Sequence, residues 1–341
     1  MNSGSCRIGV IGAGLIGGSI CKTLRTAGVK DITVFSQSES TQSQVRNDGF
    51  AIASSVTDLV AASDVVFVCV PLDVQMDVFR SVAEAVASTS RTDVVITDVS
   101  SVKGDEARTA KDLFAAVGAT FIPGHPMAGT EFSGFQASTG HMFQNATWVL
   151  CPEGAPSDVV KSVVELVLLT GARVSVLDID SHDAAVGCIS HLPYVAAASL
   201  ANVLSAQGGQ ELALQLAAGS FRDGTRVAGS EPWLSASMVT FNRTEVLRLL
   251  DVFQDEIAKM KIAIEGSNND EVLALFASAQ NVRRAYEKAK ENATQQNVVW
   301  SAAEAIAQLL NACKNGALIS GLAVTENSWS VRLEGIGSPQ E

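Results

Sequence analysis

The pattern of apolar and polar positions divides the chain into two parts with different periods. Over residues 7–151, short apolar runs such as "IGVIG", "ITVF", "VVFVCV" and "VVITDV", then "TFIPG" and "TWVL", alternate with longer amphipathic stretches. Alternation of this kind predicts a parallel sheet covered by helices. The wholly apolar run "VVFVCV" is typical of a central strand that is buried on both faces.

After Pro156 the pattern becomes helical almost throughout, apart from a strand-like run at "ARVSVL". The amphipathic runs 234–265 and 270–291 predict long helices. We therefore expect an α/β chain, in which an N-terminal Rossmann-type doubly wound parallel sheet is followed by a mostly α-helical domain.

Three segments follow from this change of period. We expect a nucleotide-binding domain at 1–160 and a helical domain at 161–292, and the remaining residues, 293–341, form a C-terminal extension. In the extension the pattern predicts one more helical run, "VVWSAAEAIAQLLNACK", and a β-prone piece, "SWSVRLEG". The pattern assigns no role to this extension.

Composition narrows the possible partners. The chain of 341 residues is 47% apolar and 18% charged, which favours a folded globular protein over disorder. A net charge of −12 disfavours nucleic acid as a partner, and an anionic ligand would need specific arginines. We expect no membrane partner and a cytoplasmic location, because no uninterrupted apolar run approaches the roughly 18 to 20 residues that span a bilayer. The six scattered cysteines form no CxxC pair and predict no metal site or disulfide framework.

A glycine-rich turn follows the first predicted strand. Gly12, Gly14 and Gly17 form a GxGxxG motif that opens a helix, which is the context this motif needs to bind a dinucleotide. Gly12 permits the tight turn, Gly14 lets a pyrophosphate approach, and Gly17 allows close packing of helix and strand. The expected cofactor-binding positions here and after the "VVFVCV" strand are Gly12, Gly14, Leu15, Ile16, Gly17, Val70 and Pro71.

The end of the second strand bears on the choice between NAD and NADP. Enzymes that use NAD commonly place an acidic residue here, whereas this chain has Ser36, Gln37 and Ser38. Small hydroxyl side chains can donate hydrogen bonds to a 2′-phosphate, so the sequence favours NADP. Glu39 leaves NAD open as the alternative.

His125 lies in "GHPMAGTEFSG", directly after the predicted strand "TFIPG". Ligands of open α/β sheets bind beyond the carboxyl ends of the strands, and "TDVSSVKG" and "FIPGHPMAG" both follow such ends. We therefore expect His125, whose imidazole titrates near neutral pH, to act in the cofactor cleft.

The helical domain carries two further histidines and two arginines of interest. His182 and His191 are nine residues apart, which puts them on opposite sides of a straight helix and argues against a shared metal. We expect His182 to be a structural hydrogen-bonding residue. We expect Arg222 to pair with a nearby carboxylate, whereas Arg226 is either structural or a ligand for an anion.

Taken together, these motifs resemble the prephenate/arogenate dehydrogenase family of tyrosine biosynthesis. The resemblance covers roughly residues 6–290 and rests on "GVIGAGLIGGS", "TDVSSVKG", "GHPMAGTEFSG", "SHLPY" and "GSFRDGTRVAGSEP", in that order. It implies an oxidative decarboxylation in which a hydride leaves ring C4 of a cyclohexadienol for the nicotinamide while the carboxylate departs as CO2.

The resemblance also implies roles for individual residues. His125 would accept the proton of the C4 hydroxyl, and Ser101 would hold its imidazole near the nicotinamide. Arg226 would bind a substrate carboxylate, and Glu131 would gate or support the site. His191 and Tyr194 would also contact the substrate, which is a small molecule, and the helical domain would form a homodimer.

Three positions depart from the family pattern. Tyr194 stands where a second histidine is common, Ser100 where glycine is common, and Trp233 directly follows "EP". Tyr194 leaves the choice between prephenate and arogenate open.

Two other readings stay open from the sequence. A β-hydroxyacid dehydrogenase would need a catalytic lysine, which "CISHLPYVAAASLANVL" lacks. A redox sensor that binds NAD(P) without turnover would have no use for His125 and Ser101.

Overall fold

The computed structural model describes residues 6–335, except 131, 207, 209, 292 and 293, and it describes no side chains for 289–291. The chain divides into two compact units. The first unit comprises Met1–His182 and Ala293–Glu341, and the second comprises Asp183–Asn292. This division differs from the predicted one, because the change of unit follows His182 and the extension joins the first unit.

A six-stranded parallel sheet forms the centre of the first unit. Its strand order is β3-β2-β1-β4-β5-β6, which is the doubly wound order with β1 and β4 at the point where the direction reverses. In register, Ile8 pairs with Ile32 on one side and with Val65 on the other. The predicted fold class is confirmed. The strands are β1 (Ile8–Ile11), β2 (Ile32–Phe35), β3 (Ala51–Ile52), β4 (Val65–Val68), β5 (Val95–Asp98) and β6 (Thr120–Ile122).

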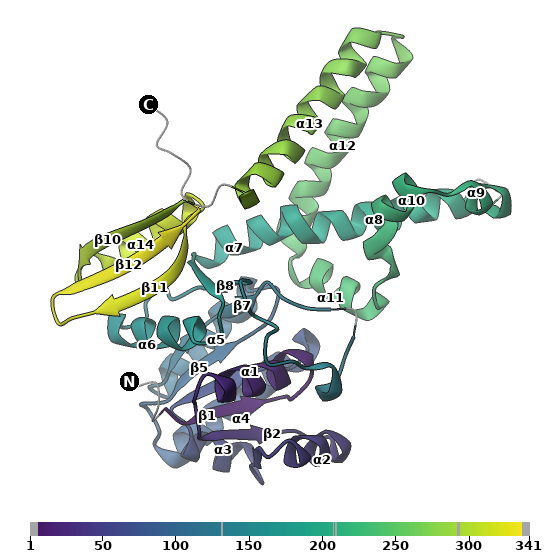
Figure 1. Ribbon diagram of the computed structural model, residues 1–341. Coiled ribbons are helices and arrows are strands. Elements are labelled where there is room, and N and C mark those ends of the chain that lie inside the picture. Colours follow the sequence, from purple (N-terminus) through teal and green to yellow (C-terminus); the bar gives the residue numbers. More distant parts are fainter. Residues whose placement is uncertain (1–5, 131, 207, 209, 292–293, 336–341) are drawn as a thin grey trace. The chain divides into compact units, whose positions relative to one another are not determined.

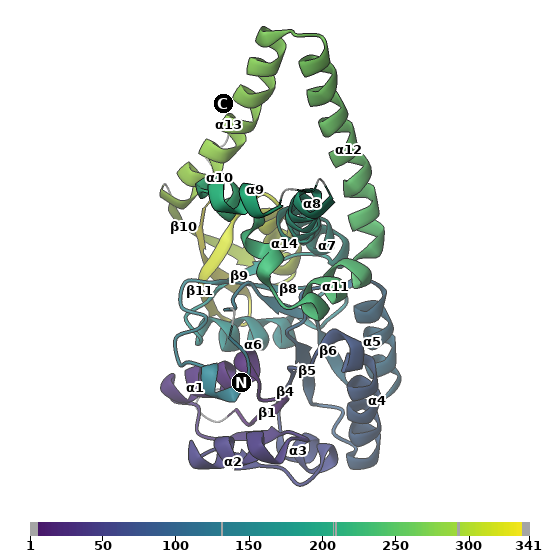
Figure 2. The same ribbon diagram turned by 90° about the vertical axis from the view of Figure 1, so that its right-hand side faces the viewer.

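Helices cover both faces of this sheet (Figure 2). Buried side chains of α1, such as Ile20, belong to one apolar cluster, and those of α3, α4 and α5, such as Phe79 and Phe114, belong to the other. β4 contributes Phe67 to the first cluster and Val66 to the second, as expected for a strand buried on both faces. The helices are α1 (Leu15–Thr26), α2 (Glu39–Asn47), α3 (Val56–Ala62), α4 (Leu72–Thr89), α5 (Gly104–Ala116) and α6 (Ser157–Leu168).

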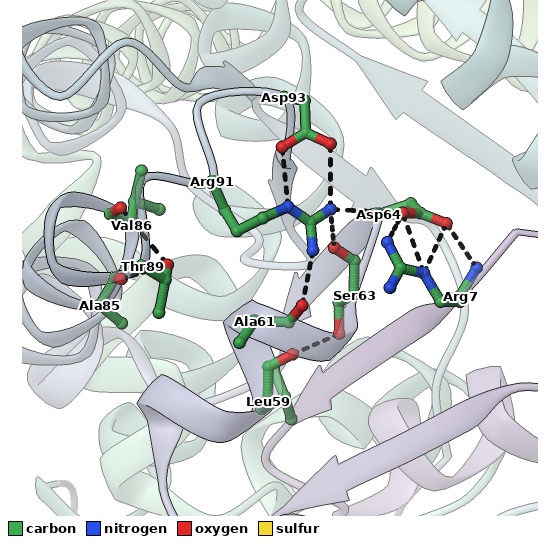
Figure 3. Close-up of polar contacts among 10 residues, drawn as sticks. All are labelled: Arg7, Leu59, Ala61, Ser63, Asp64, Ala85, Val86, Thr89, Arg91 and Asp93. Atoms are coloured by element: carbon green, nitrogen blue, oxygen red, sulfur yellow. Dashed lines mark hydrogen bonds and ion pairs between the residues drawn. The ribbon is translucent and has the colours of Figure 1, made fainter.

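Ion pairs fasten the amino ends of the central strands (Figure 3). Asp64, just before β4, accepts hydrogen bonds from the backbone and guanidinium of Arg7, just before β1. Arg91 donates to Asp93 at 2.7 Å, to the Ser63 carbonyl at 2.8 Å and to Asp64 at 3.3 Å. This network lies at the end of the sheet opposite the carboxyl ends that carry the glycine turn.

A second six-stranded sheet joins the extension to the rest of the first unit. Its order is β10-β12-β11-β9-β8-β7, and β11 pairs with β9 at Ile319 and Val174. Leu309, Ile319 and Trp329 of the extension are buried in the same apolar cluster as α1 and α6. The elements are β7 (Gly124–Pro126), η1 (Phe135–Ala137), β8 (Thr147–Leu150), β9 (Arg173–Val176), β10 (Gln295–Ser301), α14 (Ala305–Lys314), β11 (Leu318–Val324) and β12 (Ser328–Glu334).

One predicted element of the extension is wrong in part. The run "VVWSAAEAIAQLLNACK" begins as strand β10 and becomes helical only in α14. β10 forms because Val298 and Trp300 pair across to Val331 and Trp329 of β12, a partner more than 25 residues away in sequence. The predicted β-prone piece is β12.

The second unit is helical, and its helices α12 and α13 form a long hairpin (Figure 1). The predicted helix over 234–265 is divided at Asn242 into α11 and α12. Among the described residues, one continuous helical stretch, Ile179–Ala206, is long and apolar enough to cross a membrane, although it lacks a continuous apolar run. The elements are α7 (Ile179–Val186), a π-helical turn η2 (Gly187–His191), α8 (Leu192–Ala206), α9 (Gln210–Leu216), α10 (Gly219–Thr225), η3 (Arg226–Gly229), α11 (Pro232–Phe241), α12 (Arg243–Glu265) and α13 (Asn269–Glu291).

Candidate active site

The glycine turn has the geometry that a dinucleotide needs. Gly12 has a φ of +89°, and a Cβ there would lie 2.4 Å from the carbonyl oxygen of Cys69. A Cβ on Gly17 would lie 2.0 Å from the carbonyl oxygen of Gly12. A Cβ on Gly14 would meet nothing within 4 Å, and no side chain caps α1 at this residue. The first amide groups of α1 can therefore receive a pyrophosphate.

The other predicted cofactor positions surround this turn. Leu15 is the first residue of α1, and Ile16 packs partly against the core. A Cβ on Gly12 would come within 3.1 Å of the Val70 side chain, so Val70 lies beside the turn. Pro71 is exposed at the start of α4.

The end of β2 presents hydroxyl groups at the start of α2. Ser38 caps α2, and its hydroxyl oxygen accepts a hydrogen bond from the amide of Thr41 at 3.3 Å. The Ser36 hydroxyl oxygen accepts from the amide of Ser38 at 3.3 Å, which leaves its proton to be donated. Gln37 is exposed, and so is Glu39 in the first turn of the helix.

A buried ion pair organises the carboxyl end of β5. The ammonium of Lys103 lies 2.6 Å from the Asp98 carboxylate, and both side chains are 2% exposed or less. The same carboxylate accepts from the side-chain amide of Gln75 at 2.9 Å and from the Ser100 amide at 3.0 Å. Its other oxygen accepts from the amide of Gly124 at 3.0 Å. Sequence reasoning missed this group, although Asp98 and Lys103 both lie in the "TDVSSVKG" motif.

The hydrogen bond from the Gly124 amide to Asp98 fixes the backbone of the residue next to His125. A Cβ on Gly124 would lie 2.7 Å from the Asp98 carbonyl oxygen and 3.1 Å from the indole nitrogen of Trp148, so glycine is required there. His125 is the middle residue of β7 and pairs with Val149 of β8. The histidine that we expected just beyond a strand is itself held in a short strand, on a backbone anchored to the buried Asp98 carboxylate.

The imidazole of His125 is held by a second histidine. Nδ1 of His125 lies 2.9 Å from Nε2 of His182, and the rings meet edge to face at an angle of 75°. His182 is 1% exposed. No hydrogen bond joins half-buried Ser101 to the His125 ring in the described part of the chain, so its role there stays a prediction. His182 does make a hydrogen bond, as expected, but its partner is the candidate base.

A carboxyl group with a raised pKa lies two residues after the "TDVSSVKG" motif. Glu106 is in the first turn of α5, where burial, and to a smaller extent the charge of Asp105, raises its pKa to about 7.

In the second unit, His191 is held by Asn242. The side-chain nitrogen of Asn242 donates to the carbonyl oxygen of Asp183 at 2.9 Å and lies 3.0 Å from Nδ1 of His191. A carbonyl oxygen can only accept, so the amide orientation is fixed and Nδ1 of His191 must accept as well. A neutral His191 therefore carries its proton on Nε2.

Arg226 and Arg222 differ in their partners. Arg222 pairs with Asp223 at 3.0 Å, as expected. Arg226 is exposed at the start of η3 and makes no ion pair with any described residue. Tyr194 accepts a long hydrogen bond of 3.5 Å from Ser230. Glu131, the other predicted substrate residue, lies outside the described residues.

Comparison with known proteins agrees with this geometry. The family model "Prephenate dehydrogenase, nucleotide-binding domain" matches residues 20–176, and "Prephenate dehydrogenase, dimerization domain" matches residues 178–278. The chain is 32% identical over 285 residues to cyclohexadienyl dehydrogenase of Zymomonas mobilis. This match covers 82% of this chain and 95% of that protein.

Two solved structures are also similar. Synechocystis arogenate dehydrogenase has a TM-score of 0.74 and 28% identity, and the match covers 82% of this chain and 99% of that one. Prephenate dehydrogenase from A. aeolicus, solved with hydroxyphenyl propionate and NAD+, has a TM-score of 0.74 and 25% identity, and covers 82% and 98%. The family models end at residue 278, so the extension lies outside them.

Proposed function

Since the chain belongs to the prephenate dehydrogenase family, we propose that it catalyses the oxidative decarboxylation of prephenate or arogenate in tyrosine biosynthesis. A bound nicotinamide supplies the acceptor for the hydride that leaves ring C4. The bond between C1 and the ring carboxylate breaks, its electron pair enters the ring, and CO2 departs. Formation of an aromatic phenol drives the reaction.

The observation that carries this proposal is the placement of His125 on β7. As the hydride leaves, the C4 hydroxyl becomes ketone-like and its proton must be accepted. The base is His125, whose Nδ1 faces His182, so proton exchange with substrate takes place at Nε2. When decarboxylation forms the phenolate, the same proton can return to the oxygen. Ser101 lies in the loop after β5 and is proposed to line the nicotinamide side of the site.

The substrate anion is assigned to residues of the second unit. Arg226 offers a guanidinium that no described carboxylate neutralises, and its planar fork matches a carboxylate. His191 would offer an N–H donor from Nε2, with Asn242 as the residue that fixes it. Tyr194 and Glu131 are proposed substrate contacts on the family resemblance alone.

The proposed cofactor is NADP. The hydroxyl proton of Ser36 and the first turn of α2 favour a 2′-phosphate, and the exposed carboxylate of Glu39 is the feature that opposes it. kcat/KM measured with NADP and with NAD decides the point. A higher value with NAD would assign the ribose contact to Glu39.

The helical unit is proposed to form a homodimer. Seventeen of the twenty large apolar side chains that are exposed among the described residues lie in it, and only six of its described apolar side chains are buried. An exposed apolar surface of this size is typical of a protein–protein interface. We propose that a second copy of the chain covers it, in agreement with the match to a dimerization domain. Sedimentation equilibrium should give twice the chain mass. Phe276→Asp should weaken association, whereas Val299→Asp should not, because Val299 is at least as exposed but lies in the first unit.

Turnover tests the function itself. The purified protein is incubated with prephenate and with arogenate, each with NADP and with NAD, while reduced cofactor and CO2 are measured. We expect equal amounts of both products with at least one substrate. Reduction of the cofactor without CO2 would identify a simple alcohol dehydrogenase and contradict the proposal.

A further inference from the structure

The bond between His125 and His182 constrains where protons can lie. A hydrogen bond between two imidazole nitrogens contains one proton, so one ring donates and the other accepts. If His182 donated from Nε2, a neutral His125 would carry its own proton on Nε2 and could not accept another there. The base can therefore work only when His125 donates from Nδ1 and His182 accepts at Nε2.

His182 is placed firmly enough to impose this arrangement. Its ring is buried, and it lies in the first turn of α7, which Asp178 caps. The Asp178 carboxylate accepts from the amide of Ser181 at 2.7 Å and from its hydroxyl at 2.9 Å. The Asp178 carbonyl accepts from the amide of His182 at 3.0 Å. The backbone that carries His182 is thus fixed at the start of the helix.

Two ion pairs fasten this first turn to neighbouring helices. Arg108 of α5 pairs with Asp180. Lys314, the last residue of α14 in the extension, pairs with Asp178. Burial raises the pKa of Asp178, but the Lys314 ammonium and the Ser181 donors together lower it by more than burial raises it. The resulting pKa of Asp178 is about 2. The extension, which lies outside the family models, therefore contributes to the position of His182.

We infer that His182 is a positioning residue that fixes the Nδ1–H tautomer of His125, and so keeps Nε2 of His125 available as the base. The inference rests on the proposed function for its kinetic consequence. Its structural consequence, the tautomer, is independent of any substrate. Without His182, His125 would adopt the Nε2–H tautomer that neutral imidazole favours in water.

Two variants and a matched control test this role. His182→Gln can place an amide oxygen near the position of Nε2 and accept the same hydrogen bond, whereas His182→Leu cannot. His141→Leu serves as the control, because His141 is an exposed histidine on a different segment of the same unit. The chain has four histidines, so 15N labelling of histidine gives four resolvable imidazoles in long-range 1H–15N NMR spectra.

We expect the Nδ1–H tautomer at His125 in the wild type and in His182→Gln, and the Nε2–H tautomer in His182→Leu. In His182→Leu, kcat should fall by about 10-fold or more, and KM and cofactor affinity should be nearly unchanged. The loss of kcat should not exceed the roughly 10²- to 10⁴-fold that a general base contributes. His182→Gln should recover most of this loss. His141→Leu should leave tautomers and kcat unchanged.

An Nε2–H tautomer at His125 in the wild type would overturn the inference, and this measurement does not depend on any variant folding. Equal loss of kcat in the Gln and Leu variants, with equal loss of thermal stability, would show that His182 is merely structural. Failure of the proposed function looks different, because the wild type would then show the expected tautomer and no turnover with either substrate.

Discussion

Lys103→Met tests whether the buried ion pair at the end of β5 supports the backbone that carries His125. The substitution keeps the length and apolar stem of the side chain and removes the ammonium that lies 2.6 Å from Asp98. The Asp98 carboxylate stays at the centre of the motif, still with hydrogen bonds from Gln75, Ser100 and Gly124.

Removal of one partner of a buried pair costs about 3 to 5 kcal/mol, because a buried charge loses its counterion. The hydrogen bonds that these three residues still donate favour the lower end, so we expect a loss of about 3 kcal/mol in the free energy of unfolding. With a urea m value of roughly 3 kcal/mol/M for a unit of this size, the unfolding midpoint should fall by about 1 M. kcat should fall as well, because Asp98 also holds the amide next to His125.

Urea titration followed by circular dichroism measures the shift. Lys259→Met is the matched control, because Lys259 pairs with Glu256 at the same 2.6 Å while both side chains are more than half exposed. It should leave the unfolding midpoint close to that of the wild type, because solvent screens an exposed ion pair. The double variant Asp98→Asn/Lys103→Met, which removes both charges, should recover part of the loss. A midpoint for Lys103→Met equal to that of Lys259→Met would show that the buried ion pair does not stabilise the fold.

Three further outcomes are expected. Arg226→Ala should raise KM for substrate by about 30-fold or more, because it removes a charge-assisted pair from a desolvated site. Arg222→Ala should leave KM unchanged. Equal KM values for the two variants would make Arg226 structural. Asn242→Leu should lower the free energy of unfolding by about 1 to 3 kcal/mol, because buried acceptors on Asp183 and His191 lose this donor. It should also raise KM. A variant with wild-type thermal stability and KM would contradict the role of Asn242. Glu106 has a raised pKa of about 7, so its ionisation destabilises the fold progressively from about pH 4.5 to pH 7. Glu106→Gln should therefore raise Tm relative to wild type at pH 8 and have no such effect at pH 4. An equal difference at both pH values would show that ionisation of this carboxyl does not destabilise the fold.

The parallel sheet could be predicted because its signals are local. Each strand from β1 to β6 is a short apolar run bounded by turns, and the spacing of Gly12, Gly14 and Gly17 after β1 indicates a phosphate-binding turn without any knowledge of distant contacts. The position of His125 near the carboxyl ends followed from strand order alone.

What the sequence did not predict depends on contacts between distant residues. His125 and His182 are 57 positions apart, and no local pattern shows that their rings meet. β10 resembles the start of a helix in its local sequence, and it becomes a strand because β12 pairs with it. Asn242 divides a helix that periodicity predicted as continuous, and its side chain is used to hold His191.

His125→Asn tests most directly whether His125 is the base of an oxidative decarboxylation. Asparagine keeps a hydrogen-bonding group at this position and cannot accept the proton. Steady-state formation of reduced cofactor and binding of cofactor are measured on wild type and variant. We expect kcat to fall by about 10²-fold or more while cofactor affinity stays the same. A folded His125→Asn protein that turns over prephenate and arogenate at a rate close to wild type would contradict it.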